Sequence, residues 1–437
     1  MDKFFKISER GSSLSTEVVG GLTTFLAMAY IIAVNPSILG DAGVPFNAAL
    51  TATCFGAALM TIAMGLFANR PIALASGMGI NAVVAYGLCL SFGVDWRIAM
   101  AVIFLEGVII LILVVCGLRE AIMDAIPASL RLAIAIGIGL FIAFIGLKGG
   151  GIVVADESTF LAKGDLTSPT AVVAIVSILI AIILTVLKVK AGLLISIIVA
   201  TIVGVPLGVT VLPTEFSFAP DFSAFGAPFQ AMPDGVLAIV EVFAQPALLM
   251  FVFSLLMSDF FDTMGTVVAV GKQAEFVDKD NRIENVKEIL IVDSAAAAVG
   301  GLAGASSITS YIESASGVAA GARTGLSNIV IGVLFVIFAF LAPFVGMVSG
   351  AATCGALVVV GYLMMSGIGD IDWGDVSVAF PAFITIIGIP LTYSITNGIG
   401  FGFISYCIIK IAQGKAGEVK PLMWIASVAF LATFIFL

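Results

Sequence analysis

One polar stretch, residues 306–326, stands out in a sequence that is otherwise strongly apolar. It is rich in serine, threonine, glycine and alanine, and it contains one acid, Glu313. Every polar group in the hydrocarbon of a membrane must find an internal partner, so a helix facing lipid would not have this composition. An ionisable side chain at membrane depth is costly and usually marks a functional site. We therefore predict that this stretch forms half of a binding site and that Glu313 is its main polar group.

Two further acids lie near the end of a long apolar run. Asp259 and Asp262 occur in SDFFDTMGTVVAVG, and Thr266, four residues after Asp262, shares its helix face. The apolar residues that follow place Asp262 inside the membrane, and we predict it as the second acid of the site. The alternative for both acids is a solvated helix end beside a loop, and this alternative is stronger for Asp259.

The composition identifies the class of protein. The chain has 437 residues, of which 61% are hydrophobic and 11% charged, and its mean hydropathy is +1.21. Soluble domains are about one quarter charged, so this is a polytopic membrane protein. The net charge of −9 gives no reason to expect nucleic-acid binding. The five cysteines lack a CxxC spacing, so neither a disulfide framework, a metal site nor a cofactor is predicted. Histidine is absent, so proton chemistry would depend on carboxylates.

The apolar segments predict an all-α membrane fold with fourteen spans. A spanning helix needs about 20 residues, and the chain has seven such segments before a polar stretch at 212–234 and seven after it. They are 15–38, 47–68, 72–92, 97–116, 128–147, 170–188, 191–211, 245–270, 287–304, 306–322, 326–347, 349–368, 376–394 and 396–412. A last run, 421–437, would either span the membrane or lie at its interface.

The distribution of Lys and Arg predicts the orientation. With the N-terminus inside, 16 of the 19 Lys and Arg residues fall on the inner side, as the positive-inside rule requires. We therefore predict a multi-pass protein of the plasma (inner) membrane with both termini in the cytoplasm.

The two halves of the chain resemble each other in their third segments. PIALASGMGINAVVAYG (71–87) and SYIESASGVAAGARTG (310–325) are both short, rich in small residues, and contain Ala-Ser-Gly. Interrupted segments at matching positions of two halves are the best sequence indication of a transporter binding site. We predict seven-plus-seven inverted repeats, with short extended stretches in segments 3 and 10.

Four other polar residues of the apolar segments have a structural interpretation, and two of them, Asn81 and Asp293, have a functional one as well. Asn81 would either hydrogen-bond neighbouring helices or line the site, and its interrupted segment favours the site. Arg323 would end the second interrupted segment. Asp293 would support Glu313 or hold a helix end, and Glu106 would brace the first half.

A GxGD pattern at 367–370 matches that of intramembrane aspartyl proteases. Asp370 is followed by two more acids in what is predicted as an inner loop, whereas a catalytic pair would need burial at membrane depth. The protease stays a remote alternative. No GxSxG, HExxH or P-loop pattern occurs, and we do not predict an enzyme.

Three motifs carry a resemblance that extends along the whole chain apart from its last apolar run. They are GMGINA (77–82), DFFDTMGT (259–266) and SYIESASGVAAGARTGL (310–326). With these motifs the chain resembles the AzgA-like purine permeases of the nucleobase–cation symporter-2 family, which are similar in fold to the uracil permease. The resemblance implies an inverted-repeat fold with a core domain and a gate domain. It also implies a homodimer.

The resemblance implies roles for particular residues. The family's acids on the eighth and tenth spans fall on Asp262 and Glu313, and its polar residue on the third span falls on Asn81. FLAMAYIIAVNP (25–36) would place Tyr30 or Ile31 near the base, and Thr266 stands where the uracil permease type has a histidine. The predicted substrate-binding set is Asp262, Glu313, Asn81, Gly79, Met78, Ser316, Thr266, Tyr30 and Ile31. The predicted proton-coupling residues are Glu313, Asp262 and Asp259, supported by Asp293 and Arg323.

The expected function is proton-coupled import of adenine, guanine or hypoxanthine by alternating access. Carboxylates and an amide can pair with the N–H groups and ring nitrogens of a purine, and a carboxyl group held away from water takes up a proton more readily. The alternatives are a transporter of the same fold for xanthine, uracil or an inorganic anion. The predicted division is 15–116 and 235–347 for the core, and 117–234 and 348–437 for the gate.

Overall fold

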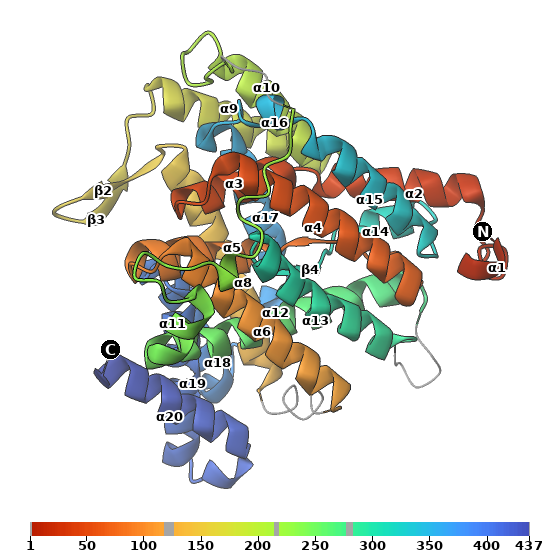
Figure 1. The fold of residues 1–437 in the computed structure, drawn as a ribbon. Coiled ribbons are helices and arrows are strands. Elements are labelled where there is room, and N and C mark those ends of the chain that lie inside the picture. The colour runs from red at the N-terminus through yellow and green to blue at the C-terminus, as the bar shows by residue number, and fades with distance from the viewer. Residues whose placement is uncertain (1, 118–125, 214–217, 277–282, 437) are drawn as a thin grey trace.

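The structure, a computed structural model, describes residues 2–117, 126–213, 218–276 and 283–436. It is a helical protein with two small two-stranded sheets (Figure 1). Three of the cations counted for the orientation, Arg119, Lys279 and Arg282, lie outside the described residues. Among the described residues, eight helices are long and apolar enough to cross a membrane, and five shorter apolar helices accompany them.

Each of the fourteen predicted segments coincides with a helix, two short helices in tandem, or a strand followed by a helix. The elements of the first half are α1 (Asp2–Phe5), α2 (Leu14–Met28), α3 (Ile31–Asp41), α4 (Phe46–Phe67), β1 (Leu74–Ser76), α5 (Met78–Ala82), the π-helix η1 (Val83–Ser91), α6 (Trp96–Val115), α8 (Ala128–Gly149), β2 (Val153–Asp156), β3 (Phe160–Lys163), α9 (Pro169–Val186) and α10 (Gly192–Gly204).

The second half repeats this plan. Its elements are η2 (Ala227–Phe229), α11 (Ala238–Ala244), α12 (Pro246–Gln273), α13 (Val286–Ala303), β4 (Ile308–Ser310), α14 (Ser314–Ala319), α15 (Leu326–Ala339), α16 (Ala342–Val345), α17 (Gly350–Met364), η3 (Met365–Asp370), α18 (Val376–Leu391), α19 (Ile395–Ala412), η4 (Ala416–Glu418) and α20 (Pro421–Phe436).

The extended stretches predicted in segments 3 and 10 are β1 and β4, and they pair with each other. The pairing is antiparallel, with Leu74 opposite Ser310 and Ser76 opposite Ile308. All residues of both strands are buried. A buried edge must satisfy its backbone groups, and Thr61 of α4 does so on one side: its hydroxyl donates to the Leu74 carbonyl (2.8 Å) and accepts from the Leu74 N–H (2.9 Å).

The helices pack in two groups. In one, α2, α3, α4, α6, α12, α13 and α15 surround the paired strands, and in the other, α8, α9, α10, α17, α18 and α19 pack together. Glycines allow the closest approaches: an added Cβ at Gly107 of α6 would collide with the backbone of Ala298 on α13. These groups correspond to the helices predicted for core and gate, but the two functional roles remain a prediction.

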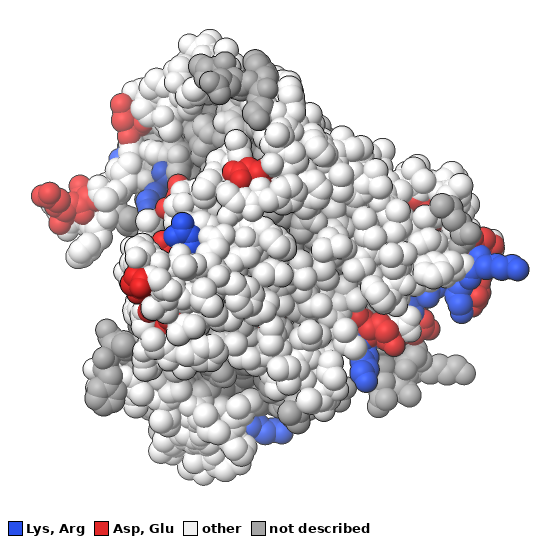
Figure 2. All heavy atoms as spheres, viewed as in Figure 1, with Lys and Arg blue, Asp and Glu red and all other residues white. Residues whose placement is uncertain are grey.

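Charged side chains are few on the face of the molecule shown in Figure 2. On the face shown in Figure 2, the surface over α4 and α13 is almost entirely uncharged, and most charged side chains lie at its margins. Large apolar side chains such as Leu59, Ile182, Val333 and Ile408 are exposed. An uncharged, apolar outer surface is what a bilayer requires, and it agrees with a multi-pass membrane protein.

Candidate functional site

The paired strands bring the two interrupted segments together at the centre of the first helix group. Beyond the strand ends, the Gly77 N–H donates to the Ser307 carbonyl (2.8 Å) and the Tyr311 N–H donates to the Ala73 carbonyl (2.9 Å). Each strand then leads into a short helix, α5 after β1 and α14 after β4. Because the strands are antiparallel, α5 and α14 leave the strand pair at opposite ends, although more than 200 residues separate the two segments in the sequence.

Glu313 lies in the turn between β4 and α14 and is bonded to the first span. The Tyr30 hydroxyl donates to Glu313 Oε1 at 2.6 Å. Tyr30 is buried at the point where the first span breaks between α2 and α3, and Ile31 beside it is also buried. The bond joins this point of the first span to the second interrupted segment. A charged acceptor makes the bond stronger than one between neutral groups.

Asp262 of α12 faces the same region. Its ionisable group and those of Glu313, Tyr30 and Tyr311 are close enough to interact electrostatically. The side chain of Asp262 is exposed. The acids predicted from the sequence thus lie on the facing elements α12 and β4–α14.

The first interrupted segment contributes an amide in place of an acid. Asn81 of α5 is completely buried, and neither its Nδ2 nor its Oδ1 has a hydrogen-bond partner among the described residues. A buried amide without partners is costly, so this side chain is prepared for a ligand or marks a site of strain. Met78 is nearly buried, and Gly79 lies against Ile138 of α8, where an added Cβ would be 2.6 Å from Cγ2.

A hydroxyl and carboxylate network connects α12 and α13 to β4. Asp293 of α13 accepts hydrogen bonds from the Thr263 hydroxyl (2.6 Å) and from the Ser310 N–H and hydroxyl (2.9 and 2.7 Å). The Thr263 and Thr309 hydroxyls are also bonded (2.9 Å). Asp293 therefore holds the strand that carries the site. Thr263 and Thr309 were not singled out from the sequence, because hydroxyl residues are common throughout this segment.

The remaining predicted residues lie around this centre. Ser316 is partly exposed on α14, and Thr266 is buried one turn after Asp262. The Arg323 guanidinium does not pair with Glu313; it donates to the carbonyls of Val318 and Ala322 (2.7 and 2.8 Å) at the end of α14. Among the described residues, no cluster of His, Cys, Asp or Glu has the arrangement of a metal site.

The N-terminal segment binds the two interrupted segments at Asn69 and at residues 323–325, away from the proposed site. Arg10 donates to the carbonyls of Asn69 and Arg323, and the buried carboxylate of Glu17 accepts from the N–H groups of Arg323 (2.9 Å) and Thr324 (3.3 Å). The Asn69 side chain bonds both Phe5 and the Gly325 N–H, at 2.9 Å each. We call Arg10, Glu17 and Asn69 the N-terminal clasp.

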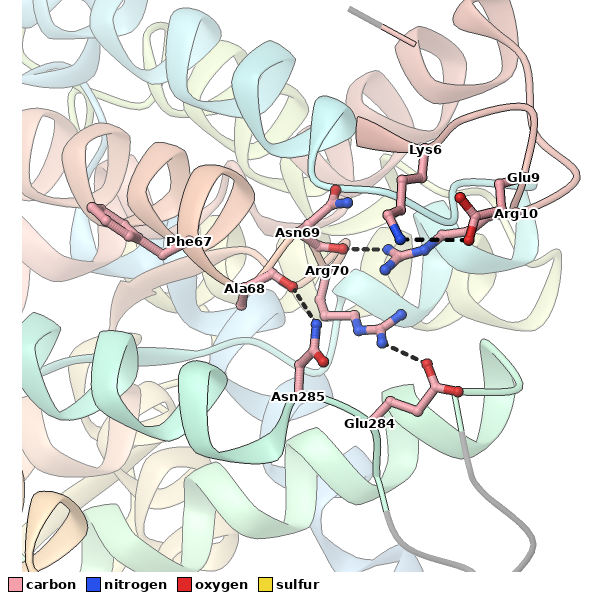
Figure 3. A pocket seen from close by; sticks show the side chains of 9 residues that line it. All are labelled: Lys6, Glu9, Arg10, Phe67, Ala68, Asn69, Arg70, Glu284 and Asn285. Carbon is pink, nitrogen blue, oxygen red and sulfur yellow. Dashed lines mark hydrogen bonds and ion pairs between the residues drawn. The ribbon is translucent and has the colours of Figure 1, made fainter. Parts of the chain in front are cut away.

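A surface pocket opens beside the N-terminal clasp and is separate from the predicted site. Its lining includes Lys6, Glu9, Arg10, Asn69, Arg70 and Glu284 (Figure 3). The cations already have partners: Lys6 pairs with Glu9 (3.5 Å), Arg70 pairs with Glu284 (2.7 Å), and Arg10 donates to Asn69. The pocket therefore belongs to the attachment of the N-terminus, and it contains none of the predicted site residues.

Comparison with known proteins gives relatives over the full length of the chain. A model described as "Permease family" matches residues 15–434. The chain is 39% identical to the adenine permease AdeP of Escherichia coli (strain K12) over all of this chain and 96% of that protein. It is 41% identical to the guanine/hypoxanthine permease PbuG of Bacillus subtilis (strain 168) over the whole of both.

A solved structure gives the same fold. The transmembrane domain of a cyanobacterial bicarbonate transporter, BicA, superposes with a TM-score of 0.67 at 16% identity, covering 88% of this chain and 97% of that one. At this identity the likeness concerns the fold alone.

Proposed function

The chain belongs to the permease family, and on that premise we propose that it imports purine nucleobases (adenine, guanine or hypoxanthine) together with protons. The observation that carries the proposal is the Tyr30–Glu313 bond beside Asp262, at the crossing of the two interrupted segments. The names of the full-length relatives support the same class of cargo.

The proposed site matches the chemistry of a purine. Glu313 and Asp262 would accept the N–H groups along the edge of the base, and Asn81 would both donate and accept. Asn81 suits this role because its amide has no partner within the described chain. The buried apolar side chains Met78 and Ile31 would cover the faces of the ring. An inorganic anion, by contrast, would meet two acids here.

Proton coupling would follow from the surroundings of the two acids. Removing a carboxylate from water favours its protonated form, and a proton on one acid would leave the other free to accept an N–H group of the base. In this scheme Glu313 takes the proton and Asp262 binds mainly the base. Asp259 is an additional candidate for the proton.

Transport would proceed by alternating access. The core (15–116 and 235–347) would carry the site, and the gate (117–234 and 348–437) would move relative to it. The close contact between Gly79 of α5 and Ile138 of α8 lies at this boundary. We place the protein in the plasma membrane as a homodimer with cytoplasmic termini.

Uptake of radiolabelled adenine, guanine and hypoxanthine tests the proposal in cells that lack their own purine permeases. We expect at least one purine to accumulate, and we expect a proton uncoupler to abolish the accumulation. If none of the three enters, the purine assignment is wrong. If uptake persists unchanged with the uncoupler, purine transport stands and proton coupling is wrong.

Asp262→Asn tests the site within the same assay. We expect normal expression and loss of concentrative uptake. The asparagine amide has one acceptor oxygen, whereas the carboxylate has two that can accept N–H groups of the base. Glu157→Gln is the control, since it removes an acid from the exposed β2–β3 turn. If Asp262→Asn still concentrates purine as well as this control, Asp262 does not belong to the site.

A further inference from the structure

Two tyrosines join the two helix groups at one end of the first interrupted segment. Tyr86 of η1, which packs on α3 and α6, is buried, and its hydroxyl donates to Asp41 Oδ2 at the end of α3 (2.8 Å). Its ring meets the ring of Tyr393, which follows α18, with centroids 5.5 Å apart and planes at 79°. Such an edge-to-face arrangement of aromatic rings is favourable. The contact therefore connects the helix group around the paired strands to the other group.

Lys148, near the end of α8, adds a positive charge to this contact. Its Nζ lies over both rings, 4.9 Å from the centroid of Tyr393 and 5.8 Å from that of Tyr86. It also donates to the Tyr393 hydroxyl (3.3 Å). Because a cation is attracted to the face of an aromatic ring, Lys148 binds one ring from each helix group. We call Asp41, Tyr86, Lys148 and Tyr393 the tyrosine cluster.

The backbone of Tyr393 has a conformation that tyrosine rarely adopts. Its φ is +53°, in the left-handed region, and it follows Thr392, the C-cap of α18. The Ser394 N–H donates to the Ile389 carbonyl (3.1 Å) and the Tyr393 N–H to the Pro390 carbonyl (3.3 Å), which is the pattern of a Schellman motif. Glycine is the usual residue at this position, because it has no Cβ to strain. The turn itself therefore does not call for a tyrosine, whereas the ring contacts do.

The tyrosine cluster and the N-terminal clasp lie at opposite ends of the first interrupted segment. Asn69 of the clasp precedes β1, whereas Tyr86 lies in η1, five residues after Asn81. A π-helix within a span is frequently found at a functional site, and η1 directly continues the short helix α5 that carries Asn81. The cluster is thus attached to the segment that provides the amide of the proposed site.

A second polar contact joins the two groups close to the cluster. The Thr396 hydroxyl, in the first turn of α19, donates to Ser254 Oγ of α12 (3.2 Å), and Thr396 is only three residues after Tyr393. Asp41 and Lys148 are exposed, so water reaches the cluster. Hydrogen bonds and cation–π contacts at exposed sites exchange for water at small net cost. Contacts of this kind can therefore open and close.

We propose that the tyrosine cluster closes the outer side of the cargo site, and that it must open to admit cargo from outside. This inference rests on the proposed function, in which the two helix groups move relative to each other, and on the orientation predicted from Lys and Arg. On opening, the contacts of the Tyr86 ring with Tyr393 and Lys148 separate. Each tyrosine keeps a polar partner in its own group, Asp41 for Tyr86 and Lys148 for Tyr393, so no hydroxyl loses its bond.

Access to position 138 measures this opening without any transport. Ile138 is buried in α8 against Gly79, further along the helix than Lys148, so a reagent from outside must pass between the two groups. The reporter is the full chain with Ile138→Cys and the five native cysteines replaced by alanine, and a membrane-impermeant maleimide is added to intact cells. We expect Tyr393→Gly and Lys148→Met each to raise the labelling rate about fivefold, because each removes part of the closing contact. Lys163→Met, which removes a cation from the exposed end of β3, is the matched control and should leave the rate unchanged.

A reversible cross-link tests whether transport needs the opening. In the chain without native cysteines, Tyr86→Cys and Tyr393→Cys together place two thiols at the facing positions, and a bifunctional methanethiosulfonate joins them through bonds that a reductant breaks. We expect the cross-link to abolish purine uptake and reduction to restore it. Each single cysteine variant, treated in the same way, should keep its uptake.

The two measurements separate this inference from the proposed function. If Tyr393→Gly and Lys148→Met label at the rate of Lys163→Met, or if the cross-linked chain still takes up purine, the cluster does not close the outer side. If the wild-type protein transports no purine at all, it is the proposed function that fails. The labelling of Ile138→Cys then still decides whether the cluster opens, because it requires no transport.

Discussion

The two interrupted segments share a plan but differ in chemistry and in their neighbours. β4–α14 carries the acid Glu313, which is bonded to Tyr30, and it packs against α2 in its own helix group: an added Cβ at Gly317 would meet the backbone of Gly20 at 2.6 Å. β1–α5 carries the neutral Asn81 without partners, and its Gly79 meets α8 of the other group. One segment thus carries an ionisable side chain and is fixed within its own helix group, and the other carries a neutral amide and lies at the boundary between the two groups.

The largest expected effect comes from removing the charge of the fixed segment. Glu313→Gln should lower purine uptake about a hundredfold, because an amide cannot take up the coupling proton and the coupling between proton and base is lost. Uptake of labelled purine is the measurement, with expression checked in the membrane fraction and Glu157→Gln as the exposed control. Uptake equal to that of the control would contradict the assignment of Glu313.

A substitution at Asn81 in the uncharged segment should lower the affinity for purine without changing the stability of the fold. Asn81→Ala should raise the KM about tenfold without lowering the temperature of unfolding, because the amide bonds nothing in the described chain. Asn328→Ala is the matched control: Asn328 donates to the carbonyls of Arg70 and Ile72 (3.0 and 2.9 Å), so its loss should destabilise the fold. An equal loss of stability in both variants would show that Asn81 is structural.

Substitutions of Gly79 and Gly317 test whether it matters for transport that α5 packs on the other helix group and α14 on its own. Gly79→Ala should slow transport about fivefold, because its Cβ meets Ile138 and overpacking costs a few kcal/mol. Ile138→Ala in the same chain should restore the rate. Gly317→Ala, inside one helix group, should mainly lower thermal stability. If the Gly79→Ala defect persists with Ile138→Ala, the α5–α8 contact does not limit the rate.

The smallest expected effect is that of the tyrosine. Tyr30→Phe removes the bond to Glu313 and should reduce uptake about threefold, which corresponds to about 0.7 kcal/mol, near the lower end of the net contribution of a single hydrogen bond. Tyr362→Phe, at an exposed position, serves as control. A loss as large as that of Glu313→Gln would mean that Tyr30 contacts the base itself.

The sequence predicted the fold and its two interrupted segments, but not the contacts that join them; the site itself stays a prediction. Glu313 and Asp262 stand out because carboxylates are rare in apolar segments, and Ala-Ser-Gly at matched positions indicated the two breaks. The pairing of Leu74 with Ser310 depends on the register of two strands from distant parts of the chain, which no local pattern encodes. The partners of Arg323 are backbone carbonyls, and these carry no sequence signal.

The N-terminal clasp has a practical consequence for work on this protein. Arg10 and Glu17 hold the far ends of segments whose near ends form the proposed site, although neither residue belongs to that site. A bulky fusion at the first residue would pull on these bonds, whereas one placed after α20, which packs mainly on α19, would not. We therefore expect an affinity tag at the N-terminus to disturb transport more than one at the C-terminus.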